Sequence, residues 1–307
     1  MFASASELRL AVSKSPLSLP FFVAREQKLF EKHNVKLQWI ECLGGNRCMQ
    51  DLVEGRADMA TSSELPFMFA LLDGNPITLV ATFTTAKDDM KFIANRNAVT
   101  NGVAALKGKR VGFVARASSH YYKDLFLLYN GLDPKEVVHV PMNADKLPNA
   151  LLGGEVDAIS VWEPWGQITL DRGAAQVVLL EAPKLYTQTF NLSVSNSYMV
   201  SGKAELRRLL QAIREANVFI KTRPIEAKAI MARSAGLDAD LVEGVWPTLL
   251  FQLSLQHSLL STLQGQTRWA KREGHVPQGT PEPDFLNFID PTHLRQLAPN
   301  AVDFAYP

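Results

Sequence analysis

The sequence predicts an α/β protein of two lobes, each built on a mostly parallel sheet with helices on both faces. Short apolar runs of strand length alternate with helical runs almost from the start of the chain. A polar break after residue 84 separates two such series, and this alternation is typical of parallel sheets that are covered on both sides. The 307 residues are enough for two domains that each bury a core.

The first series of elements extends from residue 7 to residue 84. We expect its strands over 7–13, 35–42, 57–61 and 77–84. We expect its helices over 20–33, 46–54 and 64–72. Pro20 is acceptable in the first turn of a helix, and Gly55 suits the position just after a helix end.

The second series follows the polar segment 85–89, which we interpret as a crossing between the lobes. We expect its strands over 110–114, 137–140, 156–162 and 176–181, and its helices over 119–130, 143–152 and 163–171. An extended segment over 190–200 suits the return crossing, and helices are expected over 203–221, 224–234, 237–252 and 257–273, with a short capped helix at 290–294. The predicted first lobe therefore comprises 1–86 and 194–307, and the predicted second lobe, 87–193, is inserted into it.

The composition narrows the classes of function. Hydrophobic content of 47%, charged content of 21% and a net charge of +1 give no whole-molecule reason to expect a nucleic-acid or membrane partner. None of the six histidines stands in a metal-binding spacing, and no nucleophile elbow or glycine-rich phosphate loop is present. We therefore expect a non-catalytic protein that binds a small molecule, with no cofactor and no metal.

Two further features bear on the cellular compartment. Ala3-Ser4-Ala5 matches the small-x-small pattern before a signal-peptidase cut, although no charged or apolar region precedes it. One interpretation is an exported protein whose signal is absent from this sequence, and the alternative is the N-terminus of a cytoplasmic protein. The two cysteines, Cys42 and Cys48, are expected to be separate buried side chains, with a disulfide between them as the alternative.

Small polar residues stand where three predicted strands pass into helices. In an open α/β sheet such strand ends are where ligands bind, and helix N-termini there favour anions. The candidate ligand-binding residues of this kind are Gly44, Gly45, Asn46, Ser62, Ser63, Glu64, Ser118, Ser119, His120 and Tyr121. The alternatives are a tight turn at the glycines and simple helix capping at the serines.

A fourth strand end carries an indole and a carboxylate. Trp162 could line the site against an apolar part of the ligand, and Glu163 either contacts an amine or caps its helix. Because Glu64 has a similar place in the other lobe, the two acids suit a zwitterion, such as an amino-sulfonate or an aminopyrimidine, better than nitrate.

Several segments, taken in order, resemble the bacterial periplasmic solute-binding proteins of the nitrate/sulfonate/taurine type, which share a fold with the thiamine-pyrimidine binders. The segments are GGN (44–46) with LVEGRAD (52–58), TSSELP (61–66), LKGKRVG (106–112) with SSHY (118–121), LGGEVDA (152–158) with VWEP (161–164), and WAKREG (269–274). The resemblance extends over about residues 6 to 295. It also implies ligand contact just after the first strand, where Ser13 and Ser15 lie in a loop that departs from the family's usual pattern.

The resemblance implies a two-lobed type II periplasmic-binding-protein fold with two inter-lobe crossings, in which hinge closure buries a ligand between the lobes. It implies a periplasmic monomer that delivers a sulfonate-like or taurine-like solute to the membrane permease of an ABC transporter. The alternatives are a thiamine-type pyrimidine binder and the sensing domain of a larger signalling protein. The pyrimidine synthases of this fold carry a cysteine-rich run that is missing here, which favours a binder over an enzyme.

Overall fold

The computed structural model describes residues 7–182 and 185–304, so the Ala3-Ser4-Ala5 segment lies outside the described residues. The chain divides into two compact units. The first unit comprises Met1–Thr85 and Thr189–Pro307, and the second unit comprises Ala86–Gln188. Strand β4 (Ile77–Ala86) leads out of the first unit, and strand β10 (Gln188–Ser195) leads back into it.

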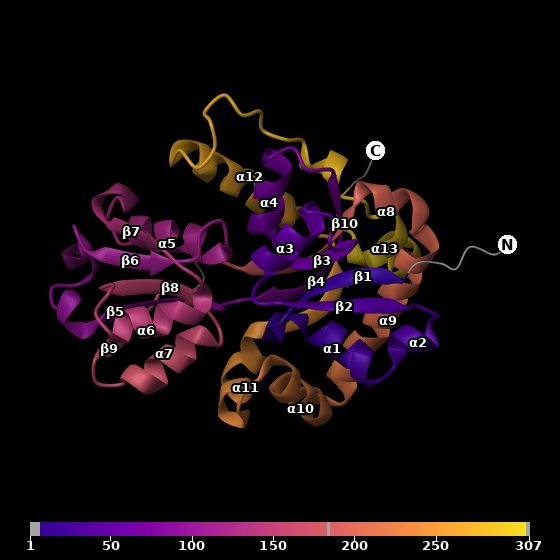
Figure 1. Cartoon of the computed structure of the whole chain (residues 1–307), viewed down its shortest axis with the longest axis horizontal. Coiled ribbons are helices and arrows are strands. Elements are labelled where there is room, and N and C mark those ends of the chain that lie inside the picture. Colours follow the sequence, from indigo (N-terminus) through magenta and orange to yellow (C-terminus); the bar gives the residue numbers. More distant parts are fainter. Residues whose placement is uncertain (1–6, 183–184, 305–307) are drawn as a thin grey trace. The chain divides into compact units, whose positions relative to one another are not determined.

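The first unit is built on a six-stranded sheet in the order β11-β4-β10-β3-β1-β2. Strands β1, β2, β3, β4 and β10 of this sheet are labelled in Figure 1. The strands not yet given are β1 (Leu8–Ser13), β2 (Leu37–Cys42), β3 (Met59–Ser63) and β11 (Leu249–Ser254). Strand β1 is parallel to both β2 and β3, whereas β10 is antiparallel to β3. Parallel neighbours bring their carboxyl ends to one edge, which positions the candidate residues after β1 and β3 together.

Helices cover both faces of this sheet. They are α1 (Leu19–Glu26), α2 (Leu29–Lys32), α3 (Gly45–Val53), α4 (Glu64–Leu72), α8 (Asn196–Ser201), α9 (Lys203–Thr222), α10 (Pro224–Ala235), α11 (Ala239–Val245), α12 (His257–Arg272) and α13 (Thr292–Leu297). The single helix expected over 20–33 is wrong, because Lys28 adopts a left-handed conformation with φ of 54° between α1 and α2. The helix expected over 237–252 is also wrong, because α11 ends at Val245, a 3₁₀ turn containing Pro247 follows, and β11 begins at Leu249.

The second unit has a five-stranded sheet in the order β7-β6-β8-β5-β9. Its strands are β5 (Met90–Asn95), β6 (Arg110–Phe113), β7 (Val138–Pro141), β8 (Ala158–Trp162) and β9 (Val177–Leu180), and its helices are α5 (Ser118–Tyr129), α6 (Leu147–Leu152) and α7 (Trp165–Gly173). Strand β5 was not expected, and it is antiparallel to both β8 and β9. The α/β class with helices on both faces is confirmed, and both sheets are mixed rather than mostly parallel.

The core of the second unit consists of two apolar clusters. Phe92 on β5 belongs to one cluster and stacks on Phe126 of α5, with ring centroids 4.1 Å apart. The next residue, Ile93, belongs to the other cluster with Leu147 and Leu151 of α6. Since successive side chains of a strand point to opposite faces, β5 is buried on both. This burial explains why a strand forms directly after the polar segment.

The same ion-pair arrangement fixes one strand pair in each unit. The Arg9 guanidinium donates to both carboxylate oxygens of Asp58, at 3.2 and 2.6 Å, and the Arg9 backbone N–H donates to the same side chain. In the second unit Arg110 binds Asp157 in the same way, and these hydrogen bonds hold the pKa of Asp157 below its usual value. Each arginine also donates to a glycine carbonyl in the turn before the aspartate. These paired arginine–aspartate hydrogen bonds fix the register of β3 against β1 in the first unit and of β8 against β6 in the second.

None of the helices in the described part of the chain is long and apolar enough to span a lipid bilayer.

Candidate functional site

Two candidate residues of the first unit lie side by side at the carboxyl ends of β1 and β3. Leu10 of β1 is level with Met59 of β3, and the continuation of this register places Ser13 level with Ser62. The backbone N–H of Ser13 donates to Thr61 Oγ1 at 2.9 Å, which ties the two strand ends together. The structure therefore brings Ser13 and Ser62 to one place, as expected for strand ends of a parallel pair.

The hydroxyls of these two serines are buried and unsatisfied. Ser13 and Ser62 are both fully buried, and neither Oγ atom has a hydrogen-bond partner among the described residues. An unsatisfied buried polar group costs about 1–3 kcal/mol, and in native proteins such groups are rare enough to need an explanation. A bound ligand that supplies acceptors is one such explanation.

The first turn of α3 closes against the same strand end. Gly44 precedes the helix with φ of 92°, in the region that favours glycine. A Cβ atom on Gly45 would lie 2.7 Å from the Cα atom of Ser62, so only glycine permits this approach. Asn46, half-buried, follows within the same turn, where helical N–H groups lack partners in the helix. The geometry suits an anion held by backbone amides beside Ser62.

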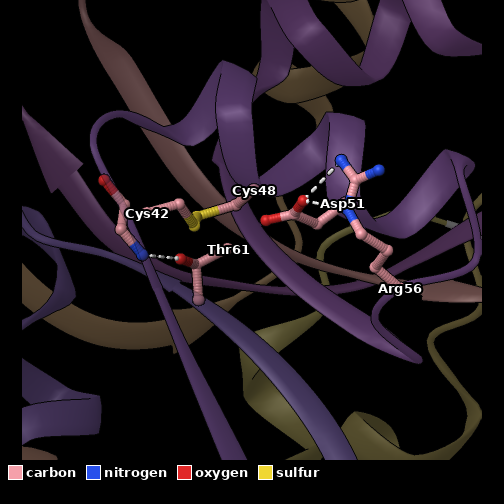
Figure 2. Close-up of a disulfide and its surroundings, with 6 residues drawn as sticks. Cys42, Cys48, Asp51, Arg56 and Thr61 are labelled. Atoms are coloured by element: carbon pink, nitrogen blue, oxygen red, sulfur yellow. Dashed lines mark hydrogen bonds and ion pairs between the residues drawn. A yellow bond between two sulfur atoms is a disulfide. The ribbon is translucent and has the colours of Figure 1, made fainter.

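A disulfide between Cys42 and Cys48 holds the glycine turn, and Figure 2 shows the bond joining the end of β2 to α3. The Cα atoms are 5.6 Å apart, within the usual range for a disulfide. Cys48 is fully buried and Cys42 nearly so. The expectation of two separate thiols is therefore wrong, because the turn folds the chain back so that six residues of separation bring the two side chains together.

The remaining candidates of the first unit are engaged by protein groups. Glu64 is fully buried at the start of α4, and its carboxylate accepts hydrogen bonds from the N–H and Oγ1 of Thr189, at 3.1 and 3.0 Å, and from Gln266 Nε2 at 3.3 Å. Ser15 Oγ accepts from the N–H of Leu17, and Ser63 occupies the position before α4 without capping it through its side chain. These contacts give Glu64 and Ser15 structural roles, and ligand contact by either stays a prediction.

In the second unit the first turn of α5 carries the other group of candidates. Ser118, Ser119 and His120 are all buried, and the residue before the helix is Ala117, so neither serine is the N-cap. Ser119 Oγ accepts from the N–H of Val114 at 3.1 Å, and the Ser119 carbonyl accepts from Ser160 of β8 at 2.8 Å. The Ser119 hydroxyl therefore anchors the loop before α5.

The two rings in this turn make contacts of different kinds. His120 Nδ1 accepts from the N–H of Arg116 at 3.4 Å, and the imidazole stacks on Phe113 with ring centroids 4.5 Å apart. The Tyr121 ring lies edge-on to Tyr186, with centroids 5.7 Å apart. Ligand contact by these residues stays a prediction.

The carboxylate at the end of β8 caps its helix. Glu163 Oε2 accepts from the N–H of Gln167 at 2.8 Å, and Lys91 Nζ lies 3.9 Å from Glu163 Oε1. Burial raises the pKa of Glu163, and burial together with the Glu163 charge raises the pKa of the neighbouring Asp89 to about 8. Half-buried Trp162 packs against the core. The capping alternative for Glu163 therefore accounts for its position, and Asp89 is a buried acid that sequence reasoning missed.

Sequence reasoning also missed a buried network on α5. Lys123, with no exposed surface, pairs with Asp124 and lies 2.9 Å from His139 Nδ1. His139 Nε2 lies 2.9 Å from the carbonyl of Pro134, so Nε2 carries the proton and Nδ1 accepts from the lysine. The available signal was the helical spacing, because Lys123 falls on the same face as Phe126 and Leu127.

Comparison with known proteins identifies the family and the fold to which this chain is similar. The profile of the family described as NMT1/THI5 like matches residues 15–227. A Bacillus subtilis protein named as an aliphatic sulfonates-binding protein is 28% identical over 244 residues, which cover 78% of this chain and 73% of the relative. A Saccharomyces cerevisiae protein, 4-amino-5-hydroxymethyl-2-methylpyrimidine phosphate synthase THI12, is 22% identical over 69% of this chain and 66% of its own.

Among solved structures, the alkanesulfonate-binding protein SsuA of Xanthomonas axonopodis pv. citri, bound to MOPS, superimposes with a TM-score of 0.80. The match covers 94% of this chain and all of the other at 20% identity, which shows the same periplasmic-binding-protein fold. The family profile covers more than half of the present sequence. The chain therefore belongs to the NMT1/THI5 like family.

Proposed function

We propose that this protein is the solute-binding component of an ABC-type import system and that its ligand is a small organic anion, with a sulfonate as the leading candidate. The protein would work outside the cytoplasm and pass its ligand to a membrane permease without transforming it. The observation that carries this proposal is the pair of buried, unsatisfied hydroxyls of Ser13 and Ser62 beside the first turn of α3. That the two lobes close over the ligand stays a prediction of the sequence.

The hydroxyls of Ser13 and Ser62 and the N–H groups in the first turn of α3 suit a sulfonate. A sulfonate presents several acceptor oxygens and one negative charge, and serine hydroxyls together with helix N–H groups are donors that match it without a formal cation. The names of the relatives from Bacillus subtilis and Xanthomonas axonopodis support the same ligand class.

The buried acids favour a simple anion over an aminopyrimidine. An exocyclic amine would need a carboxylate acceptor, and the carboxylates of Glu64 and Glu163 are both engaged by backbone N–H groups of the protein. The two acids that the sequence analysis considered as partners for the amine of an aminopyrimidine therefore already bind protein groups. The relation to the yeast synthase keeps that alternative as the second candidate.

A thermal-shift screen of the purified protein with methanesulfonate, taurine, nitrate and an aminopyrimidine tests the proposal. A ligand present at 100 times its dissociation constant stabilises the folded state by about 2.7 kcal/mol, which is readily measured. Ser62→Ala should reduce the shift with methanesulfonate. Ser193→Ala is the matched control, because Ser193 is also buried with an unsatisfied hydroxyl but pairs with Ala60, away from the carboxyl end of β3.

Stabilisation by the sulfonate that disappears in Ser62→Ala and persists in Ser193→Ala would support the proposal. Absence of any shift with the sulfonates, or a shift of unchanged size in Ser62→Ala, would contradict it. Stabilisation by the aminopyrimidine alone would favour the second candidate.

A further inference from the structure

The first unit has a surface hollow of about 460 Å³ where α9 and α13 meet. Its polar lining residues are Lys203, Arg207, Arg208 and Gln211 of α9, and His293 and Gln296 of α13. Binding sites for small molecules usually have volumes of about 300–1,000 Å³. The hollow is therefore large enough for a ligand made of several linked groups.

The α9 side of the hollow is one continuous helix face. Lys203, Arg207 and Gln211 follow one another at intervals of four residues, a spacing that aligns side chains along a helix. From residue 203 to residue 211 the helix rises about 12 Å. Helix α13 packs against α9, and the Arg214 guanidinium donates to the carbonyl of Leu297 at the end of α13, at 2.6 Å. Hydrogen-bond donors therefore line the hollow over about two helical turns.

The side chains of this hollow carry an excess of positive charge. Lys203 and Arg207 form no ion pair with any of the described residues. Arg208 Nη2 lies 3.8 Å from Glu205 Oε1, and the other oxygen of Glu205 accepts from the Tyr198 hydroxyl. Within the described part of the chain, three cations are thus accompanied by one carboxylate at ion-pair distance, although the net charge of the whole chain is only +1.

Two buried nitrogen atoms of the hollow lack hydrogen-bond partners. They are Arg208 Nε and His293 Nδ1, and neither has a partner among the residues that the structure describes. Burial lowers the pKa of His293, against the opposing effect of the Asp290 charge. The Lys203 and Arg207 charges lower this pKa further, which places both cations near the imidazole. Unsatisfied buried groups are rare in native proteins, and a bound anion would provide acceptors for both nitrogen atoms.

The hollow shares no residue with the strand ends that carry Ser13 and Ser62. The N–H of Ser195 donates to the carbonyl of Asp58, so the chain enters α8, and then α9, beside the amino end of β3. Ser62 lies near the carboxyl end of the same strand. The hollow is therefore a separate site of the first unit.

We propose that this hollow binds a small molecule that carries two or more linked phosphate groups. Guanidinium groups match the geometry of phosphate oxygens and keep their charge at every physiological pH. A single tetrahedral anion would occupy a small part of the volume, whereas linked phosphates extend along the row of donors on α9. The inference does not depend on the proposed sulfonate ligand and gives the protein a second anion site.

Isothermal titration calorimetry with tripolyphosphate tests the inference. The titration is made in about 0.1 M NaCl, where the Debye length of about 10 Å limits attraction by distant charges. The wild-type protein should bind tripolyphosphate at least tenfold more tightly than inorganic phosphate. Lys203→Gln/Arg207→Gln removes two of the three cations and should weaken binding of tripolyphosphate at least tenfold.

Lys221→Gln/Arg223→Gln is the charge-matched control, because it removes two exposed cations at the other end of α9. It should change the affinity less than twofold, and circular dichroism will verify that every variant folds. Ser62→Ala should also leave the affinity for tripolyphosphate unchanged, and a loss of binding in this variant would overturn the inference by assigning the anion to the strand ends.

The remaining outcomes are equally decisive. Absence of binding to the wild-type protein, or equal affinities for phosphate and tripolyphosphate, would overturn the inference. An equal loss of affinity in the two double variants would overturn it by indicating attraction to the overall charge. Co-sedimentation with phosphatidylglycerol vesicles in the absence of binding to free tripolyphosphate would overturn it in favour of a membrane surface. Because the screen with sulfonates is a separate measurement, each of these results leaves the proposed function standing.

Discussion

Reduction of the Cys42–Cys48 disulfide is expected to destabilise the first unit by about 2 kcal/mol. The two cysteines are six residues apart, and the entropy lost by the unfolded chain on closing a loop of about seven residues corresponds to roughly 2 kcal/mol at 25 °C. Reduction leaves both sulfur atoms in place, so it tests the cross-link without emptying the core around Cys48. Because both side chains are buried, the protein must be reduced while unfolded and then refolded.

Urea unfolding with and without dithiothreitol, followed by circular dichroism, measures this effect. With a denaturant slope of about 3 kcal/mol per M, the loss corresponds to a midpoint lower by roughly 0.7 M. The double variant Cys42→Ala/Cys48→Ala is the control, and its midpoint should not respond to the reductant. If oxidised and reduced wild-type protein unfold at the same urea concentration, the loop-closure reasoning is refuted.

Two further predictions concern Asp89 and Gly45. Burial raises the pKa of Asp89 to about 8, so between about pH 4 and 8 the folded state holds a proton that the unfolded state releases, and stability falls as pH rises through that range. Asp89→Asn should reduce the difference in unfolding free energy between pH 5.5 and pH 8, measured by urea unfolding. An unchanged difference would contradict the assignment of this pH dependence to Asp89. Gly45→Ala should cost about 1–3 kcal/mol in the same assay, because the added Cβ meets Ser62 at the backbone. Gly279→Ala, where nothing lies within 4 Å, should change stability by less than about 0.5 kcal/mol, and equal effects of the two substitutions would refute the steric argument.

Local signals were sufficient to predict most of the elements. Helix α4 extends over the predicted residues 64–72, because an acid opens it and Asp73-Gly74 closes it. Strand β5 was missed because it directly follows a charged segment, and its burial on both faces depends on helices that come later in the chain. Strand β11 was interpreted as the end of a helix, since a short apolar run after a helix has no periodicity of its own.

The candidate site also contains residues that local sequence signals indicate and residues whose role depends on distant parts of the chain. Ser62 at the end of β3 could be found from the sequence, because strand ends and helix starts leave local signals, whereas Ser13 at the end of β1 was indicated by the family resemblance. The role of Glu64 could not, because its partners Thr189 and Gln266 are more than 100 residues away in the chain. A cavity of about 510 Å³ in the second unit was equally hidden, since β5, β9 and α5, which line it, are brought together only by the tertiary structure.

The arrangement of the second unit within the chain has a practical consequence. Residues 86–188 form one uninterrupted stretch that includes a complete five-stranded sheet and both of its apolar clusters. A gene fragment encoding only this stretch would therefore carry every residue needed for that core. No single fragment could do so for the first unit, whose sheet is assembled from segments on both sides of the insertion. Biosynthesis from the N-terminus would thus complete the second unit before the first unit has received its remaining strands.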